Sequence, residues 1–572
     1  MLHGIAVSPG VAIGEAYLFK RRKMSAVSRY AISEEDIPKE IARFEEALIK
    51  TRSEIVNIQG KIAKELDSGH ADIFDAHLLL LEDRMFIEEV IKGLKKEKVN
   101  VEQVVTGVLE KISSVFPKVG DEYLRERVSD INDVGNRVIK NLLGKEEKNL
   151  ASLSKEVIVV AYDLSPSETA QMHREKVIGF VTDVGGKTSH TAIMARSLEI
   201  PAVVGLQNVT QNIKDGDTII IDGTAGLVIV EPTEKELRAY RKKKEEIILQ
   251  DKELAKIREL PAETRDGHQI ELVANIEFPE EIPSAIEHGA QGIGLYRTEF
   301  FYLNRTDLPS EEEHFQAYRR VAERFAPQAV IIRTLDLGGD KFISHLAVPK
   351  EMNPFMGWRA IRFCLERLDI FKVQLRAILR ASRYGKIKVM FPMISGVEEL
   401  RRAKEVMEEV KDNLKKDEVP FDEEIKIGVM IETPSAAITA DILAKEADFF
   451  SIGTNDLIQY ALAVDRINER IAYLYNPGHP AIIRLIKQTV DAAHQRKIPV
   501  GMCGEMAGEP YFAPLLLAMG LDELSMSPVV IPEVKKVIRS ITFKEGKKLL
   551  EDALKLSTGE EVASFLKENL PC

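Results

Sequence analysis

Eight short apolar runs alternate with helix-like segments between residues 261 and 572, and this alternation limits the possible folds more than any other feature. The segments between the runs place apolar residues at the spacing of amphipathic helices. Eight strands, each followed by a helix, are typical of a closed parallel (β/α)8 barrel. We therefore predict a TIM barrel domain over residues 261–572. Its strands are expected at residues 271–276, 292–297, 330–335, 388–393, 425–432, 449–455, 499–505 and 523–527.

The amino-terminal part of the chain combines a strand-rich region with a long helical block. The first twenty residues read as short strands, and dense charge at helical spacing follows. The simplest organisation is an α/β domain, residues 1–20 and 147–231, with a helical bundle of residues 21–146 inserted into it. Its later strands are expected at 157–160, 177–181, 202–204, 218–221 and 227–230, and the inserted helices at 40–63, 71–94, 101–115 and 121–143.

Residues 232–260 consist almost entirely of charged residues and helix formers. This composition predicts a solvated linker helix between the α/β domain and the barrel. A partner-binding coiled coil is an alternative, although the heptads are poor.

Composition excludes several classes of protein. The 572 residues carry a net charge of −12 without a sustained basic block, which argues against nucleic acid as a partner. The apolar runs are too short to span a bilayer, and the first ten residues do not resemble a signal peptide. The three cysteines, Cys364, Cys503 and Cys572, lack paired spacing. We therefore expect a cytoplasmic protein without membrane insertion.

A glycine pair followed by hydroxyl residues and a histidine occurs at residues 185–190, GGKTSH. An apolar run precedes it and a helical pattern follows it, so Thr188 or Ser189 suits a helix N-cap. His190 would then lie in the first helical turn, where free N–H groups and the helix dipole favour an anion. An imidazole there could accept a phosphoryl group. The alternative is an ordinary strand–turn–helix unit with an incidental histidine.

Polar residues gather at the predicted carboxyl ends of the barrel strands, where TIM barrels carry their reacting groups. Arginines on different strands would converge on a multiply charged anion, because guanidinium groups grip phosphate and carboxylate in bidentate fashion. Two carboxylates could hold Mg²⁺ beside that anion, and a thiol could face it. A surface ion pair, a helix cap and a small buried residue are the alternatives for single members. The set comprises Arg297, Arg333, Glu432, Asn455, Asp456 and Cys503, with Arg359 and Arg466 in following loops.

A phosphate-accepting histidine and a separate anion-binding barrel together indicate phosphoryl transfer from a small phospho-acid to His190. No Walker A or kinase glycine-rich loop is present, so ATP is not indicated.

The motifs around these residues resemble those of enzyme I of the bacterial sugar phosphotransferase system, the phosphoenolpyruvate–protein phosphotransferases. The resemblance extends over essentially the whole chain. It rests on GIAVSPG at 4–10, DLSPS at 163–167, GGKTSH at 185–190 onward to Arg196, GLYRTE at 294–299, DLGGDK at 336–341, NP at 353–354 onward to Arg359, GTNDL at 453–457 and GMCGE at 501–505.

The resemblance implies that His190 accepts the phosphoryl group and that Cys503 protonates the enolate. It implies that Glu432 and Asp456 bind Mg²⁺. The residues implied to bind phosphoenolpyruvate are Arg297, Arg333, Arg359, Asn455, Asp456 and Arg466.

The resemblance also implies partners. The helical insert would dock the histidine phosphocarrier protein HPr, with residues 69–77, GHADIFDAH, contributing, and the barrel would mediate a homodimer. Two alternatives stay open. A pyruvate phosphate dikinase or phosphoenolpyruvate synthase would need an ATP-grasp domain, for which no segment is free. A non-catalytic scaffold that binds phosphoenolpyruvate would not need the histidine, the thiol and the Mg²⁺ ligands.

Overall fold

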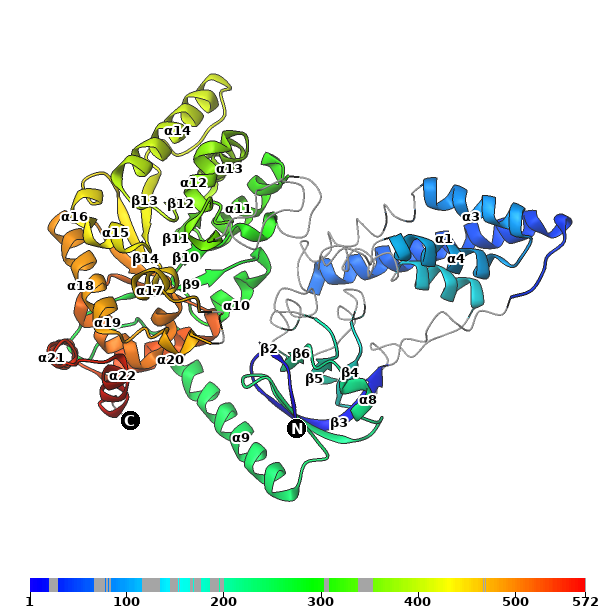
Figure 1. The fold of residues 1–572 in the computed structure, drawn as a ribbon, viewed down its shortest axis with the longest axis horizontal. Coiled ribbons are helices and arrows are strands. Elements are labelled where there is room, and N and C mark those ends of the chain that lie inside the picture. Colours follow the sequence, from blue (N-terminus) through cyan, green and yellow to red (C-terminus); the bar gives the residue numbers. More distant parts are fainter. Residues whose placement is uncertain are drawn as a thin grey trace. The chain divides into compact units, whose positions relative to one another are not determined.

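The computed structural model describes residues 1–19, 29–65, 78, 81, 84–115, 134–144, 153, 155–164, 168, 176–185, 195, 200–302, 308–337, 353–466, 468 and 470–570. The chain forms two compact units, residues 1–251 and 252–572 (Figure 1). Among the described residues, no helix has the length and apolar character needed to cross a membrane.

An eight-stranded sheet forms the centre of the first unit. Strands β3 to β6 run parallel, and the remaining neighbours pair antiparallel, in the order β1-β8-β7-β3-β4-β5-β6-β2. The first strands of the chain thus pair with strands that follow the helical block, as the predicted α/β fold requires. The strands are β1 (Leu2–His3), β2 (Ile5–Ser8), β3 (Val11–Phe19), β4 (Val157–Ala161), β5 (Val177–Thr182), β6 (Ala202–Val204), β7 (Thr218–Asp222) and β8 (Leu227–Val230).

The helical block of this unit has its own apolar core, built around Phe44, Ile55, Val90 and Val105. Its described helices are α1 (Ile37–Glu65), α3 (Arg84–Glu97) and α4 (Val101–Val115), with a further helical segment at 134–143. The expected helices at 71–94 and 121–143 lie partly outside the described residues. The segment 69–77 and His190 lie entirely outside them.

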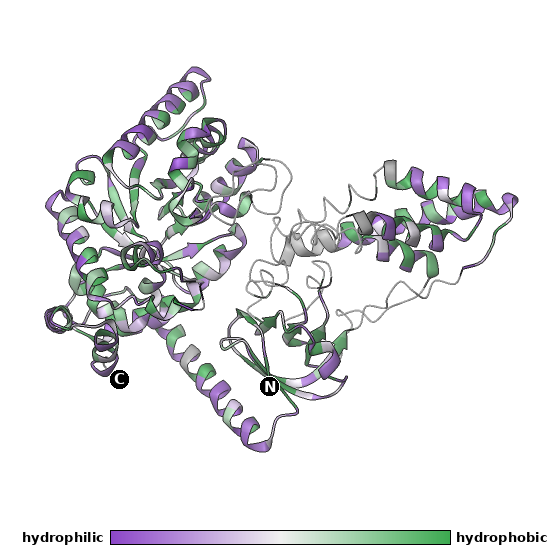
Figure 2. Ribbon diagram, viewed as in Figure 1, coloured by the Kyte–Doolittle hydropathy of each residue, from purple (hydrophilic) through white to green (hydrophobic). Residues whose placement is uncertain are grey.

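Helix α9 (Glu234–Ile257) follows β8 and begins with a capping box. The Thr233 hydroxyl accepts a hydrogen bond from the Glu236 N–H, and the Glu236 carboxylate accepts one from the Thr233 N–H. The helix is mainly hydrophilic (Figure 2), but it is not fully solvated as the composition suggested. Leu237, Tyr240 and Ile247 pack against an apolar cluster of the sheet. Over residues 237–247, one face of α9 therefore belongs to the core of the first unit.

The second unit is a closed barrel of eight parallel strands, as predicted, in the order β9 to β16 with β16 pairing back to β9. The strands are β9 (Glu271–Ile276), β10 (Ile293–Tyr296), β11 (Ala329–Arg333), β12 (Lys386–Phe391), β13 (Lys426–Ile431), β14 (Phe449–Ile452), β15 (Val500–Met502) and β16 (Glu523–Met526).

Helices surround the barrel (Figure 1), and α14 shows why they form. Its apolar residues recur every three or four positions and are buried, while charged residues occupy the opposite face. The α-helices are α10 (Ile282–Glu287), α11 (Glu311–Phe325), α12 (Ala360–Glu366), α13 (Leu368–Ala381), α14 (Val397–Lys416), α15 (Pro434–Ile438), α16 (Ala440–Leu443), α17 (Thr454–Leu462), α18 (Pro480–Gln495), α19 (Ala513–Met519), α20 (Ile531–Ser540), α21 (Phe543–Ala553) and α22 (Gly559–Glu568).

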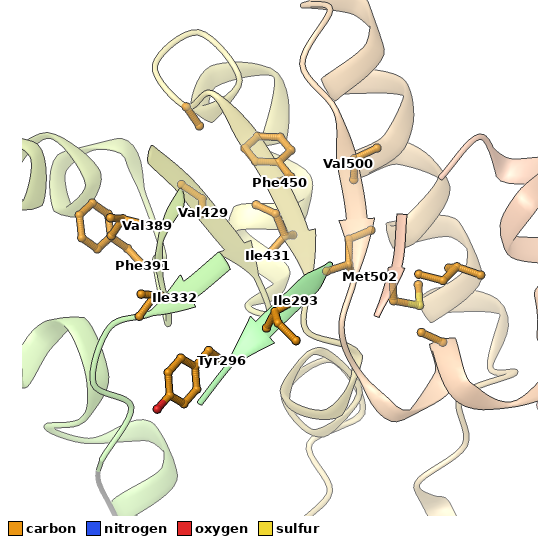
Figure 3. Close-up of a cluster of buried hydrophobic side chains, with 14 of the residues drawn as sticks. Ile293, Tyr296, Ile332, Val389, Phe391, Val429, Ile431, Phe450, Val500 and Met502 are labelled. Atoms are coloured by element: carbon orange, nitrogen blue, oxygen red, sulfur yellow. The ribbon is translucent and has the colours of Figure 1, made fainter. Parts of the chain in front are cut away.

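Alternate strand residues face opposite sides of the barrel wall, because the side-chain period of a strand is two. Figure 3 shows residues such as Ile332 and Val429, which pack with the helices in one continuous core. Their neighbours Ile331 and Met430 belong to a separate cluster made only of strand and strand-end residues, which fills the barrel interior. That interior cluster also contains Cys503, so the predicted reactive thiol rests on an apolar layer.

Several predicted strands extend past the observed ones at their carboxyl ends. The expected run 449–455 ends at Ile452, and α17 already begins at Thr454. The run 499–505 ends at Met502. Asn455 and Cys503 therefore lie just beyond the strands, in the loops and helix starts where a barrel carries its site.

The carboxyl of Glu523, at the start of β16, generates a prediction about stability. Burial raises the pKa of Glu523 to about 7, with Lys388 acting in the opposite direction. Since this folded-state pKa exceeds the ordinary value of 4.5, the folded protein binds more protons than the unfolded chain between these values. The free energy of unfolding should therefore fall as the pH rises through this window.

Glu523→Gln should flatten this pH dependence in unfolding measurements at pH values from about 5 to about 8. Glu568→Gln changes an exposed carboxyl on α22 and is the control. An unchanged slope in the Glu523 variant would contradict the assignment.

Candidate active site

Two buried arginines share one carboxylate at the carboxyl ends of the barrel strands. Arg333 ends β11 and is 8% exposed, and Arg359 precedes α12 and is 7% exposed. Asp336 accepts from both: Oδ2 lies 2.9 Å from Arg333 Nη1, and Oδ1 lies 2.8 Å from Arg359 Nη2. Glu299 Oε1 lies 2.8 Å from Arg333 Nη2. The two guanidinium groups are thereby held in one orientation.

The charges of this cluster keep both arginines firmly cationic. Burial lowers the pKa of Arg333, but Glu299 and Asp336 raise it by more, and the net shift is upward. The pKa of Arg359 is also raised, because Asp336 and Asp456 outweigh its burial. Arg359 additionally donates to the Tyr460 hydroxyl at 3.2 Å.

The two predicted metal ligands lie beside these arginines. Glu432 follows β13 and is 1% exposed, and its Oε1 accepts from the Met393 N–H at 2.5 Å. Asp456, in the first turn of α17, lies 3.5 Å from Arg359 Nη1 through Oδ1. Burial and the negative charge of Asp456 raise the pKa of Glu432 well above its usual range. A cation placed between the two carboxylates would stabilise their charged forms.

Glycine permits the close approach of the segments that carry these groups. A Cβ on Gly453 would lie 2.9 Å from a carboxylate oxygen of Glu432. A Cβ on Gly504 would lie 1.9 Å from the Thr454 hydroxyl oxygen. The two glycines thus allow the loop after β15 and the start of α17 to meet next to Glu432.

Cys503 follows β15 and is 3% exposed. Its Sγ lies 3.9 Å from the Ile452 carbonyl oxygen. Burial raises the pKa of the thiol to about 11, although Ser451 and Arg333 act to lower it. This shift depends on the surrounding barrel layer, which no local pattern around Cys503 encodes. The thiol stays protonated at neutral pH.

A second, more exposed group of residues adjoins the buried cluster. The carboxylate oxygen Oε1 of Glu505 accepts from Asn455 Nδ2 and from Arg466 Nη1, at 3.0 Å in each case. Asn455 Oδ1 accepts from the Glu505 N–H at 2.9 Å. Arg297 lies directly after β10, and its Nη1 is 2.5 Å from Glu277 Oε1.

The structure thus brings together all the predicted barrel residues. Gln459 connects the two groups, because its Oε1 accepts from the Arg466 N–H at 2.9 Å and its Nε2 lies 3.5 Å from Asp456 Oδ1. Arg297 also contributes to the charge around Cys503. His190, the predicted phosphoryl acceptor, lies outside the described residues. The roles of all these residues stay predictions.

Three acidic residues that hold the arginines, Glu299, Asp336 and Glu505, were not among the predicted site residues. The three residues stand inside the motifs GLYRTE, DLGGDK and GMCGE. An acidic residue within a motif at the carboxyl end of a predicted strand is the signal that could have found them. Their partners could not be assigned without the fold.

The carboxylate oxygens of Glu432 and Asp456 are suitable ligands for Mg²⁺. The buried cluster contains the guanidinium groups of Arg333 and Arg359 and four carboxyl groups, two more potential negative charges than positive ones. Mg²⁺ is held in proteins by one or two carboxylates together with substrate oxygens. Among the described residues, no group of three or more His, Cys, Asp and Glu residues is arranged to hold a metal. A pair of carboxylates would leave coordination positions for substrate oxygens.

Comparison with protein families identifies the chain. Residues 251–543 match the family model described as PEP-utilising enzyme, PEP-binding domain. Residues 3–127 match PEP-utilising enzyme, N-terminal, and residues 153–226 match PEP-utilising enzyme, mobile domain. The phosphoenolpyruvate-protein phosphotransferase of Staphylococcus carnosus is 47% identical over 567 residues, 99% of this chain and 98% of the relative. The chain belongs to the phosphoenolpyruvate–protein phosphotransferase family.

A second relative agrees with this assignment. The phosphoenolpyruvate-protein phosphotransferase of Haemophilus influenzae is 47% identical over 570 residues, 100% of this chain and 99% of the relative. The chain is also similar to a solution structure of Enzyme I (nEIt), with 51% identity over 43% of this chain and 99% of that chain and a TM-score of 0.37. Family membership confirms the resemblance found in the motifs, and it makes the chain an enzyme of the phosphotransferase class.

The shared carboxylate of Asp336 leads to a prediction about the stability of the barrel. Asp336→Ala leaves two buried guanidinium groups without a partner between them, which should lower the free energy of unfolding by about 3–5 kcal/mol. Scanning calorimetry of the full chain would show the shift in the barrel transition. Asp369→Ala removes a 60% exposed carboxylate that pairs with Arg367, and should cost less than about 1 kcal/mol. Equal effects of the two substitutions would contradict a central role for Asp336.

Proposed function

We propose that the protein transfers the phosphoryl group of phosphoenolpyruvate to His190, with Mg²⁺, and then to the phosphocarrier HPr, as the first step of sugar uptake by the phosphotransferase system. The observation that carries the proposal is the cluster at the carboxyl ends of the strands, where Arg333 and Arg359 adjoin Glu432, Asp456 and Cys503. A phosphorylated carboxylic acid needs cationic groups at both ends, and this cluster offers them next to carboxylates for Mg²⁺ and to a protonated thiol.

The arginines would bind the substrate. Arg333 and Arg359 are fixed by carboxylates, so they present charge to an anion without losing side-chain freedom on binding. Arg297, Arg466 and Asn455 would complete the contacts. Each of these three now bonds to the partly buried Glu277 or to the exposed Glu505, which a substrate anion would replace.

Glu432 and Asp456 would hold Mg²⁺, which when bound supplies Lewis-acid neutralisation of phosphoryl and enolate charge. Glu432 is kept in place by the Met393 N–H, and Asp456 by its position in the first turn of α17. Both side chains thus reach the site from rigid strand or helix ends.

The reaction breaks the bond between phosphorus and the enol oxygen and forms a bond from phosphorus to a ring nitrogen of neutral His190. The electron pair left on the enol oxygen makes an enolate. Cys503 would then give its proton to the enolate carbon, which yields pyruvate and a thiolate. A thiol with a pKa of about 11 carries its proton at neutral pH, and Arg333 would stabilise the thiolate until solvent returns the proton.

The partners belong to the same proposal. The helical block of the first unit would bind HPr, residues 69–77 contributing, and the barrel would associate as a homodimer. The protein would work in the cytoplasm, where both phosphoenolpyruvate and a phosphocarrier protein are available.

Labelled phosphoenolpyruvate tests the proposal directly. Incubation with Mg²⁺ and without ATP should place an acid-labile, base-stable phosphoryl group on His190, and a chelator should prevent it. His190→Ala should abolish the label while substrate binding at the barrel persists. Labelling that depends on ATP would favour a dikinase instead, and full labelling of the His190→Ala protein would refute the assignment of the acceptor.

Cys503→Ala should still bind phosphoenolpyruvate but form pyruvate at a rate lower by about a hundredfold or more, because general-acid catalysis contributes on that order. In the parent protein, the thiol loses its proton only as the pH rises towards its pKa of about 11. The rate of pyruvate formation should therefore fall only in that pH range. Cys364→Ala, at a buried thiol on α12, is the matched control. If the Cys503 variant forms pyruvate at the parent rate, the thiol is only a packing residue.

A further inference from the structure

A glutamine behind the site bonds to two of the loops that carry its arginines. Gln374 lies on α13 and is fully buried. Its Oε1 accepts from the Leu335 N–H at 2.9 Å, in the segment after β11. Its Nε2 donates to Thr298 Oγ1 at 3.0 Å, in the segment after β10, and to the Tyr318 hydroxyl at 3.2 Å. One side chain from a surrounding helix thus connects two neighbouring strand ends.

The bond made by Thr298 completes this connection. Its hydroxyl donates to the Arg333 carbonyl oxygen at 3.0 Å. Thr298 directly follows Arg297, and Leu335 directly precedes Asp336. Gln374 and Thr298 therefore hold two backbone groups, the Leu335 N–H and the Arg333 carbonyl, next to the residues proposed to bind the substrate or to hold its arginines.

The support continues away from the site as a buried polar chain. The Tyr318 hydroxyl lies 2.9 Å from His314 Nδ1, and His314 Nε2 lies 3.1 Å from the Tyr302 hydroxyl. The Tyr318 ring also packs edge-on against Tyr296 of β10, at 5.7 Å between centroids, and Figure 3 labels Tyr296 in the barrel wall. All of these side chains are buried.

A buried network of hydrogen-bonded side chains costs more desolvation free energy than an apolar core. Apolar residues of the same volume would pack there without the need to satisfy each donor and acceptor, whereas a satisfied polar network specifies one geometry. Gln374 uses its acceptor and both of its donors in bonds of normal length. The gain from this arrangement is a fixed separation of the two strand ends.

We propose that Gln374 is a positioning residue for the phosphoenolpyruvate site: it sets the distance between the loops of Arg297 and Arg333 and the placement of Asp336. Through Asp336 it also governs Arg359, which shares that carboxylate with Arg333. The inference rests on the proposed function, because it assigns a role relative to that substrate. Charged groups must be held closely to the geometry of a bound anion, and small displacements are costly.

Two variants separate positioning from stability. Gln374→Met keeps the volume but loses both strand-end bonds. Tyr318→Phe removes one bond to Gln374 and leaves its bonds to Leu335 and Thr298 intact. Gln374→Met loses three buried hydrogen bonds, and Tyr318→Phe loses two, those to Gln374 and His314, so both variants should melt at a lower temperature than the parent. Binding of phosphoenolpyruvate is measured by calorimetry in the His190→Ala background, where no turnover occurs.

We expect Gln374→Met to raise the Kd for phosphoenolpyruvate by about tenfold or more, and Tyr318→Phe to change it by less than about threefold. The inference is overturned if Gln374→Met folds and binds as the parent does. It is also overturned if both variants weaken binding equally.

A second pair of variants tests the same inference if Gln374→Met does not fold. Thr298→Val keeps the shape but cannot donate to the Arg333 carbonyl, whereas Thr298→Ser can. Weak binding in the valine variant and parent-like binding in the serine variant support the inference, and equal binding in the two refutes it. If the His190→Ala protein itself does not bind phosphoenolpyruvate, the proposed function fails and the inference falls with it.

Discussion

The carboxylate of Asp336 between Arg333 and Arg359 is the interaction on which the proposed site depends. Each of the three side chains is less than a tenth exposed, and an isolated charge at such a place costs several kcal/mol. Each charge is tolerated because the others lie within hydrogen-bonding distance. The cluster therefore exists only when the strand end of β11, its following loop and the start of α12 are all in place.

The closed barrel holds these three segments in place. Parallel strands place all their carboxyl ends on one rim, so residues far apart in sequence become neighbours. The rim also receives support from outside, through Gln374 and the buried polar chain on α11. The apolar interior layer beneath it excludes water and gives the Cys503 thiol its raised pKa. The same barrel thus explains the fixed arginines and the protonated thiol.

The proposed reaction needs a second part of the chain, because the acceptor histidine is not a barrel residue. The first unit has its own sheet and cores, and α9 extends from its last strand. The apolar face of α9 and the pair Lys243–Asp222 bind the amino-terminal half of that helix to the sheet. A phosphoryl acceptor in a separate folded unit can serve two partners in turn, which is what transfer from a small molecule to a carrier protein requires.

The sequence by itself determined the barrel, the α/β region and the residues at the strand ends, since hydrophobic periodicity and strand-end chemistry are local signals. It also determined the family, through the motifs around Arg297, Cys503 and their neighbours. Only the tertiary structure decided which carboxylate holds which arginine, the shifted pKa of Cys503, the packed face of α9 and the bonds of Gln374 to two strand ends. Each of these depends on burial or on contacts between residues distant in sequence, such as Gln374 with Thr298, and no local pattern encodes such a pairing.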